Sequence, residues 1–246
     1  MIRIAAAGDL HFGRDSAGTL RPHLERLANQ ADVLLMTGDL TKWGDPEEGA
    51  VLARELAAVG VPTVTVLGNH DYQSNAQGEV RRALEGAGVT VLEGEHTLLE
   101  IDGTRLGVAG VKGFGGGFPG ACATDFGEPE MKAFVRHTKN VSCLLQIALE
   151  EIRDADVRVA LSHYSPVVET LQGERLEIYP FLGSYLLAEA IDTAGADLAL
   201  HGHAHAGAEA GMTPGGIPVR NVAQQVIKRP YNVYCFAERR ASPVSV

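Results

Sequence analysis

Runs of apolar residues alternate with stretches of helical periodicity in the N-terminal part of the chain. In residues 20–30, Leu20, Leu24 and Leu27 recur at the spacing of one helix face, and residues 46–59 are also predicted to be helical. Short apolar runs predict strands at residues 2–7, 33–37 and 63–67. Strands that alternate with helices are typical of βαβ units, so we expect a parallel sheet.

The middle of the chain has a different pattern. Asp102 and Gly103 form a two-residue hairpin signal between the expected strands 97–101 and 104–109. The glycine-rich residues 113–127 predict an irregular surface loop. The apolar spacing in residues 128–154 predicts one long amphipathic helix or two broken ones.

The remaining elements continue an α/β pattern. We expect strands at residues 157–161 and 198–200 and a helix at residues 182–194. Residues 217–222 and 233–237 are predicted to be antiparallel strands that close the fold. Because no linker, repeat or low-complexity tract interrupts the chain, the simplest prediction is one domain over residues 1–246.

Composition and charge narrow the class of protein. The 246 residues are 45% hydrophobic and 21% charged, which excludes collagen, a coiled coil and a largely disordered chain. The net charge of −10 argues against broad binding to extended nucleic acid or to an anionic membrane surface. It does not argue against a small phosphate ester, because a bound metal can dominate the local field.

The sequence also bears on the compartment. The longest apolar runs are shorter than the ~20 residues of a membrane span, and no basic segment leads into an apolar one at the start, so we expect a cytoplasmic protein without a membrane segment. Cys122, Cys143 and Cys235 are odd in number and lie far apart in the chain. They predict buried free thiols rather than a disulfide framework.

Polar side chains with metal-binding chemistry follow the ends of the predicted strands. In chain order they are Asp9 and His11, then Asp39, then Asn69, His70 and Asp71, then His163, and finally His201, His203 and His205. Successive parallel strands present their carboxyl ends at the same edge of a sheet, where α/β proteins build their sites. We therefore expect these residues to converge in space.

Such a cluster requires a counter-charge. Buried polar groups need partners, and neighbouring carboxylates repel each other unless a cation neutralises them. Two divalent metal ions satisfy both requirements. Imidazole suits Zn, Fe, Mn and Ni, whereas carboxylate and amide oxygens suit harder ions such as Mn, so Mn²⁺ is the first expectation and Fe, Zn or Ni are alternatives.

The chain resembles the calcineurin-like metallophosphoesterase superfamily in five blocks that occur in the family's order. They are Asp9-Leu10-His11, Gly38-Asp39, Gly68-Asn69-His70-Asp71, His163 and Gly202-His203-Ala204-His205. The resemblance implies an α/β fold, the four-layer αββα sandwich, with two mixed β-sheets flanked by helices. It covers most of the chain.

The resemblance also implies roles for these residues. One metal ion would be held by Asp9, His11, Asp39 and His205. The other would be held by Asp39, Asn69, His163 and His203, so that Asp39 and a water or hydroxide bridge the pair. His70 would contact the phosphate or protonate the leaving oxygen, a role that an imidazole titrating near neutrality suits. Asp71 would either orient His70 or serve as a turn or helix-capping carboxylate.

Departures from individual branches of the family narrow the expected substrate. The arginine that phosphoprotein phosphatases carry shortly after the Gly-Asp pair is missing after Gly38-Asp39, and His70 stands where lipid A precursor diesterases usually carry arginine. The chain resembles the small bacterial phosphodiesterases, including the class III cyclic-nucleotide group. We therefore expect hydrolysis of a small phosphodiester, with a phosphomonoesterase as the alternative.

Two hypotheses from other classes are weaker. A catalytically silent scaffold of the same fold would lack ligands or the histidine, whereas all seven ligand positions and His70 carry competent residues. Residues 115–120 fit G-x-G-x-x-G, but Pro119 lies inside the motif and no clean helix follows, so a dinucleotide fingerprint is disfavoured. The oligomeric state is open.

Other residues are candidates for the rim or the surroundings of the site. Trp43 and Tyr164 follow expected ligands and either stack on a substrate or simply pack. Phe114 and Phe118 belong to the loop that either covers the site or lies elsewhere on the surface. Among the remaining histidines, His23, His96 and His137 are expected to be solvated, and His201 to be buried or to support a ligand.

Overall fold

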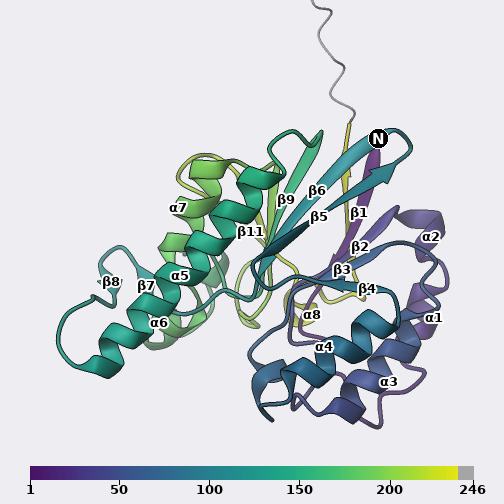
Figure 1. Cartoon of the computed structure of the whole chain (residues 1–246), viewed down its shortest axis with the longest axis horizontal. Helices are drawn as coiled ribbons and strands as arrows, with labels where there is room; N and C mark the ends of the chain where they lie inside the picture. The colour runs from purple at the N-terminus through teal and green to yellow at the C-terminus, as the bar shows by residue number, and fades with distance from the viewer. Residues whose placement is uncertain (238–246) are drawn as a thin grey trace, which may run out of the picture.

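Two mixed β-sheets form the centre of the computed structural model, which describes residues 1–237 (Figure 1). Residues 238–246 of the predicted domain lie outside the described residues. The first sheet has the strand order β13-β1-β2-β3-β4. Its strands are β1 (Ile2–Ala7), β2 (Val33–Met36), β3 (Thr63–Thr65), β4 (Val89–Val91) and β13 (Asn232–Phe236). Strands β1 to β4 are parallel to one another, and β13 runs antiparallel to β1.

The second sheet has the order β11-β12-β10-β9-β6-β5. Its strands are β5 (Glu95–Ile101), β6 (Thr104–Val111), β9 (Val157–Ser162), β10 (Leu198–His201), β11 (Ala210–Met212) and β12 (Pro218–Asn221). The four central strands are parallel, and the two edge strands are antiparallel to their neighbours. Asp102 and Gly103 both have positive φ angles and form the predicted hairpin turn between β5 and β6.

Helices cover the outer face of each sheet. The first sheet is covered by α1 (Arg21–Leu24), α2 (Leu27–Gln30), α3 (Pro46–Leu56) and α4 (Gln77–Gly86). The second is covered by α5 (Pro129–Glu151) and α7 (Tyr185–Ala194) (Figure 1). The shorter elements are the 3₁₀ turns η1 (His70–Tyr72), η2 (Glu169–Leu171) and η3 (Leu176–Ile178), helices α6 (Tyr179–Leu182) and α8 (Gln224–Ile227), and the hairpin β7 (Gly117–Phe118) and β8 (Ala121–Cys122).

Three apolar layers hold these elements together. Alternate residues of each strand face opposite sides of its sheet, so Ile4 and Leu35 lie between the two sheets, whereas Leu34 and Met36 face α3 and α4. A third layer around Leu149 joins the second sheet to α5 and α7. Both faces of each sheet are therefore buried, which explains the continuous apolar runs in the central strands. The predicted αββα arrangement of two mixed sheets flanked by helices is confirmed.

Several local predictions need correction. Residues 20–30 form two short helices, because the chain breaks at residues 25–26 while Leu24 and Leu27 both stay buried. Residues 113–127 are not simply a surface loop, since Phe118 is buried and the segment contains the hairpin β7–β8. The three cysteines are exposed rather than buried, because Cys143 and Cys235 lie on outward faces of α5 and β13, and Cys122 lies in the short strand β8, whose two residues are both exposed.

The predicted closing pair of strands was also wrong. Residues 217–222 and 233–237 contain β12 and β13, but these strands belong to different sheets. Strand β12 runs parallel to β10, and β13 runs antiparallel to β1. Helix α8 lies between them in the chain and carries it from one sheet to the other. In addition, α4 and β4 were not predicted, although Val80 and Leu84 of α4 show the spacing of one helix face.

No helix in the described range of residues 1–237 is both long and apolar enough to cross a membrane.

The layered core gives a direct test on helix α5. Leu149 is fully buried, whereas Ile147 two residues earlier is 50% exposed. We expect Leu149→Ala to lower the free energy of unfolding by about 2–5 kcal/mol, because it removes buried contacts and leaves a cavity. Ile147→Ala, the matched control, should change it by less than about 0.5 kcal/mol. Urea denaturation measures both, and equal effects would contradict the assigned helix face.

Candidate metal centre

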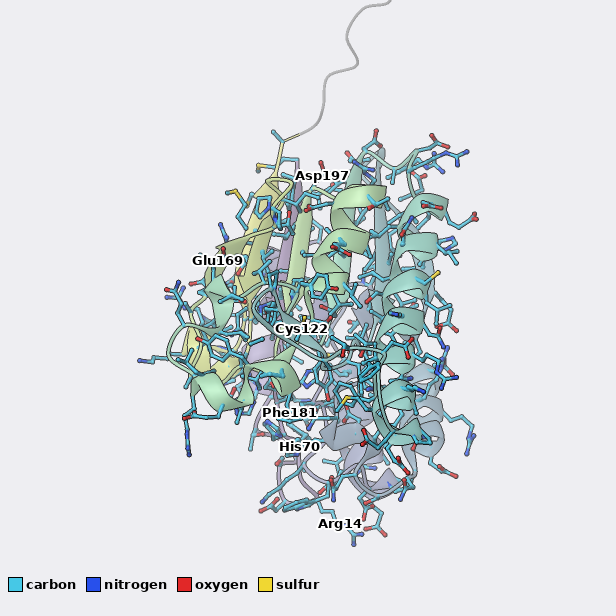
Figure 2. All side chains as sticks on the ribbon, turned by 90° about the vertical axis from the view of Figure 1, so that its left-hand side faces the viewer. Arg14, His70, Cys122, Glu169, Phe181 and Asp197 are labelled. Carbon is cyan, nitrogen blue, oxygen red and sulfur yellow. The ribbon has the colours of Figure 1, made fainter. Side chains whose placement is uncertain are left out.

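The predicted site residues lie at the carboxyl ends of strands from both sheets. Asp9 follows β1, Asp39 follows β2 and Asn69 follows β3, all in the first sheet. His163 follows β9 and His203 follows β10 in the second sheet. In Figure 2, His70 lies toward the end of the molecule opposite Asp197, which immediately precedes β10. The expected convergence at one strand edge therefore occurs, and it joins two sheets rather than one.

The first cluster contains Asp9, His11, Asp39 and His205, with one donor atom of each within 4.8 Å of the others. His205 Nε2 lies 2.9 Å from Asp9 Oδ1 and 3.5 Å from His11 Nε2. The loops that carry Asp9 and Asp39 are joined by backbone bonds, because the Asp9 amide donates to Gly38 and the His11 amide donates to Asp39. This pairing fixes the spacing between the two carboxylates.

The second cluster contains Asp39, His163 and His203 within the same 4.8 Å limit. His163 Nε2 lies 3.3 Å from Asp39 Oδ1 and 2.9 Å from Asn69 Oδ1. Asn69 thus joins the cluster from the end of β3. Since Asp39 belongs to both clusters, its carboxylate is placed between two groups of donors.

Four of these side chains leave the backbone in a conformation that non-glycine residues rarely adopt. Asp9, His11, Asp39 and His203 have φ angles of 58°, 45°, 47° and 69°. Such left-handed residues cost free energy and concentrate at functional sites. The conformation turns each side chain away from the direction of its strand and toward the shared edge.

Two glycines make room for the carboxylates. A Cβ atom on Gly68 would lie 2.1 Å from Asp39 Oδ1, and one on Gly202 would lie 2.2 Å from Asp9 Oδ2. Neither position can therefore accept a larger residue without displacing a carboxylate. This steric reason accounts for the glycine in the Gly68-Asn69 and Gly202-His203 blocks.

Burial controls the protonation of the site. It raises the pKa of Asp9 to about 6 and lowers the pKa of His11 to about 4 and of His203 to about 3. Burial also lowers the pKa of His163 well below its ordinary value. These three imidazoles are therefore neutral near pH 7 and retain a lone pair for a metal. His205 differs, because its hydrogen bond to Asp9 raises its pKa.

The arrangement around His163 fits a cation. Its Nδ1 lies 2.8 Å from the Thr37 carbonyl oxygen, so the proton resides on Nδ1 and the Nε2 lone pair faces Asp39. The histidine is fully buried, which disfavours a second proton on the ring. Electron-rich atoms of two side chains thus face each other, and a divalent metal satisfies them. The mixed imidazole and carboxylate donors fit such an ion.

His70 and Asp71 have separate tasks. The His70 amide donates to Asp39 Oδ1, and its ring Nδ1 lies 2.8 Å from the Lys42 carbonyl, leaving Nε2 3.9 Å from Asp39 Oδ2. Asp71 is fully buried and accepts hydrogen bonds from the Leu40, Thr41 and Gly68 amides and the Thr41 hydroxyl. It therefore joins the β2 and β3 loops. Of the two roles expected for Asp71, the turn carboxylate is the one observed, because the His70 ring Nδ1 faces the Lys42 carbonyl instead.

Two of the aromatic residues suggested by the sequence lie beside the clusters, one exposed and one buried. The Trp43 ring is 54% exposed, with its centroid 6.4 Å from that of His70. The Tyr164 ring is buried and stands 4.4 Å from the His203 ring. The Phe181 carbonyl oxygen lies 3.3 Å from His203 Nε2, and Figure 2 shows Phe181 near His70 in projection.

The remaining histidines behave as expected. His23, His96 and His137 are exposed. His201 is fully buried, and its two ring nitrogens contact the Thr170 hydroxyl and the Gly202 carbonyl. It therefore supports the loop that carries His203 and His205.

Sequence reasoning missed two charged residues at the same strand edge. Lys112 immediately follows β6, and its carbonyl accepts the His163 amide. Glu93 follows β4 by two residues and accepts hydrogen bonds from the Tyr72 hydroxyl and the Leu67 amide. The rule that located the ligands, a polar residue directly after a strand, would have found Lys112.

Comparison with known proteins identifies the family. The sequence pattern of the calcineurin-like phosphoesterases matches residues 2–207. The chain belongs to this family. Membership supports a metal-dependent phosphoester hydrolase, and the two clusters contain donor atoms of the kind that could hold a metal ion. None of the curated proteins compared with the chain matches it.

Solved structures support the same fold. Phosphopantetheinyl hydrolase (PptH) from Mycobacterium tuberculosis aligns with a TM-score of 0.70, 14% identity and coverage of 98% of each chain. TT1561 of Thermus thermophilus aligns at 0.54 with 21% identity over 89% of this chain and 88% of its own. A putative 5′-nucleotidase from Staphylococcus aureus aligns at 0.56 with 18% identity, over 89% of this chain and 48% of its own. At these identities the likeness shows the fold alone.

The two clusters of this metallophosphoesterase predict a defined metal stoichiometry. Metal-stripped protein titrated with Mn²⁺ should bind two equivalents by calorimetry and by elemental analysis. Asp39→Ala should abolish binding of both, because its carboxylate belongs to both clusters, whereas His11→Ala and His163→Ala should each weaken one site by at least about tenfold. His23→Ala, at an exposed histidine, is the control. One equivalent in the wild-type protein would contradict the pair.

Proposed function

We propose that the chain is a binuclear metal-dependent phosphodiesterase that acts on small phosphodiesters. The observation that carries the proposal is the sharing of one buried carboxylate, Asp39, by two groups of metal donors. The first metal would be held by Asp9, His11, Asp39 and His205. The second would be held by Asp39, Asn69, His163 and His203. Mn²⁺ is the proposed ion, because it accepts both imidazole and hard oxygen donors.

The bound ions would supply an activated water near neutral pH and neutralise charge on the phosphoryl oxygens. The protein's own residues hold the proposed metal ligands in position. The Thr37 carbonyl fixes the His163 ring by accepting its Nδ1 proton, and Asp9 anchors the His203 loop by accepting the His203 amide. Preorganised donors of this kind need no rearrangement during the reaction, which is the main source of rate in phosphoryl transfer.

His70 is the proposed catalytic acid. Its Nδ1 is engaged by the Lys42 carbonyl, so Nε2 is the atom available to a substrate. The side chain is 36% exposed, and Nε2 lies on the Asp39 side of the ring. A proton held at Nε2 can pass to the leaving oxygen of an ester, and the same atom can bind a phosphoryl oxygen. Asp71 contributes only through the loops that carry Asp39 and His70.

The surroundings favour a diester over a monoester. A phosphodiester carries an organic group on each side of the phosphorus. The site extends in two directions, toward the exposed rim at Trp43 and toward a cavity that Asn69 and Tyr164 help to line. A monoester would use one of them. The net charge of −10 favours a small substrate rather than extended nucleic acid.

A phosphomonoesterase is the second candidate. Lys112 lies at the same strand edge, in the electrostatic field of Asp39, and an extra cation suits the additional negative charge of a monoester. The names of two structural neighbours, phosphopantetheinyl hydrolase and putative 5′-nucleotidase, show that proteins of this fold differ in substrate. A catalytically silent scaffold is disfavoured, because every proposed ligand and His70 is in place.

A paired assay tests the proposal. Mn²⁺-loaded protein should hydrolyse bis(p-nitrophenyl) phosphate with a kcat/KM well above that for p-nitrophenyl phosphate. Asn69→Ala should abolish the metal-dependent activity, and His70→Ala should lower kcat by about 10²–10⁴-fold. His96→Ala, an exposed histidine, is the control. The opposite ranking of the two esters would replace the diesterase by the monoesterase, and no hydrolysis with Mn, Fe, Zn or Ni would contradict both.

A further inference from the structure

A cavity of about 430 Å³ adjoins the proposed second metal position. Asn69, a proposed ligand, lies in its wall, and Tyr164, which packs against His163 and His203, forms another part. The volume falls within the range of small-molecule sites. A phosphoryl group at Asn69 would therefore have space for one of its substituents in this cavity.

The outer wall of the cavity is one face of α5. His137, Val141 and Leu144 line it, at the spacing that places residues on one side of a helix. Phe114, from the segment after β6, stands opposite, with its ring centroid 4.6 Å from that of His137. Most of this wall is aromatic or aliphatic. It suits an apolar group rather than a sugar, which would require several hydrogen-bonding partners.

A single cation lies in the same cavity. Lys112 Nζ stands 5.0–5.2 Å from the ring centroids of Tyr72, Phe114 and Tyr164, an arrangement of three aromatic rings around one ammonium group. Its hydrogen bond to the Gly113 carbonyl is long, at 3.3 Å.

Nearby charges leave the Lys112 ammonium available. Glu93 also lines the cavity, and its carboxylate and that of Asp39 act on Lys112 electrostatically. Within residues 1–237, however, no ion pair brings a carboxylate oxygen to within 4.0 Å of Nζ, and Glu93 instead accepts hydrogen bonds from the Tyr72 hydroxyl and the Leu67 amide. Ring faces hold the ammonium group but do not use its N–H donors. Its capacity to donate to an anion is therefore retained.

We propose that this cavity binds an apolar, preferably aromatic, organic group of the phosphodiester, and that Lys112 binds a negatively charged phosphoryl oxygen at its inner end. The proposal rests on the proposed function and names the class of substrate. Lys112 directly follows β6, and His163 directly follows β9. Because these two strands are parallel neighbours, the two residues lie at adjacent strand ends. Lys112 and Asn69 both line the cavity, so Lys112 would lie near a phosphoryl group held at Asn69.

Binding of two phosphonates tests this without turnover. Phenylphosphonate and methylphosphonate present the same anion with and without an aromatic group. By calorimetry on Mn²⁺-loaded wild-type protein, we expect phenylphosphonate to bind at least about tenfold more tightly, because its ring leaves water for the cavity. Equal affinity would overturn the proposal.

Variants on α5 test whether the phenyl group of phenylphosphonate binds in this cavity. Leu144→Asp places a charge in the cavity wall and should remove the preference for phenylphosphonate. Ile147→Asp is the matched control, because Ile147 is 50% exposed on the same helix, compared with 44% for Leu144, and does not line the cavity. Loss of the preference in both variants, or in neither, would overturn the assignment of the cavity.

Lys112→Met tests the cation. The substitution keeps an unbranched side chain among the rings and should weaken binding of both phosphonates by about tenfold or more. Unchanged affinity would overturn the role of Lys112.

The outcome of these binding experiments can be distinguished from the outcome for the proposed function. If phosphonate binding behaves as expected but no diester is cleaved, the phosphodiesterase fails and the cavity stands; if diesters are cleaved without the phenyl preference, the cavity fails.

Discussion

The structure depends most on one buried carboxylate that two sheets share. Asp39 is 1% exposed and lies at the end of β2, yet its oxygens face His163 from the second sheet as well as His11 and the His70 amide from the first. An ionised carboxylate in such a position requires compensating positive charge. Metal ions on its two sides would provide that charge, and they would also link the sheets, because each cluster combines residues from both.

This constraint explains features that the hydrophobic core does not require. Left-handed backbone at Asp9, His11, Asp39 and His203 costs stability, and the glycines at positions 68 and 202 leave room for carboxylate oxygens. The fully buried Asp71 holds two loops with four hydrogen bonds. The carboxyl ends of the strands are thus shaped for ligand placement, while the apolar layers between and outside the sheets provide the rigidity on which that placement depends.

Much of the site could be predicted from the sequence, because polar residues directly after apolar strands are a local signal. The core strands could also be predicted from a local signal, since burial on both faces makes them continuously apolar. The pairing of β12 and β13 with different sheets could not be predicted, because it depends on the long-range path of the chain through α8. The exposure of Cys143 and Cys235 depends on which face of an element each occupies, and that of Cys122 on its place in the β7–β8 hairpin, neither of which a single residue reveals. The two roles open for Asp71 could not be separated, because three of its four hydrogen bonds come from Leu40 and Thr41, which are distant in sequence.

The most direct test of the shared carboxylate is electron paramagnetic resonance of the protein loaded with two equivalents of Mn²⁺. Two ions that share the Asp39 carboxylate are exchange-coupled, so the account predicts the closely spaced hyperfine lines of a coupled Mn²⁺ pair. In His163→Ala, with the second site weakened, one equivalent of Mn²⁺ should give the spectrum of an isolated ion. A wild-type spectrum that contains only isolated Mn²⁺ at two bound equivalents would contradict the account, because the two ions would then lie too far apart to share Asp39.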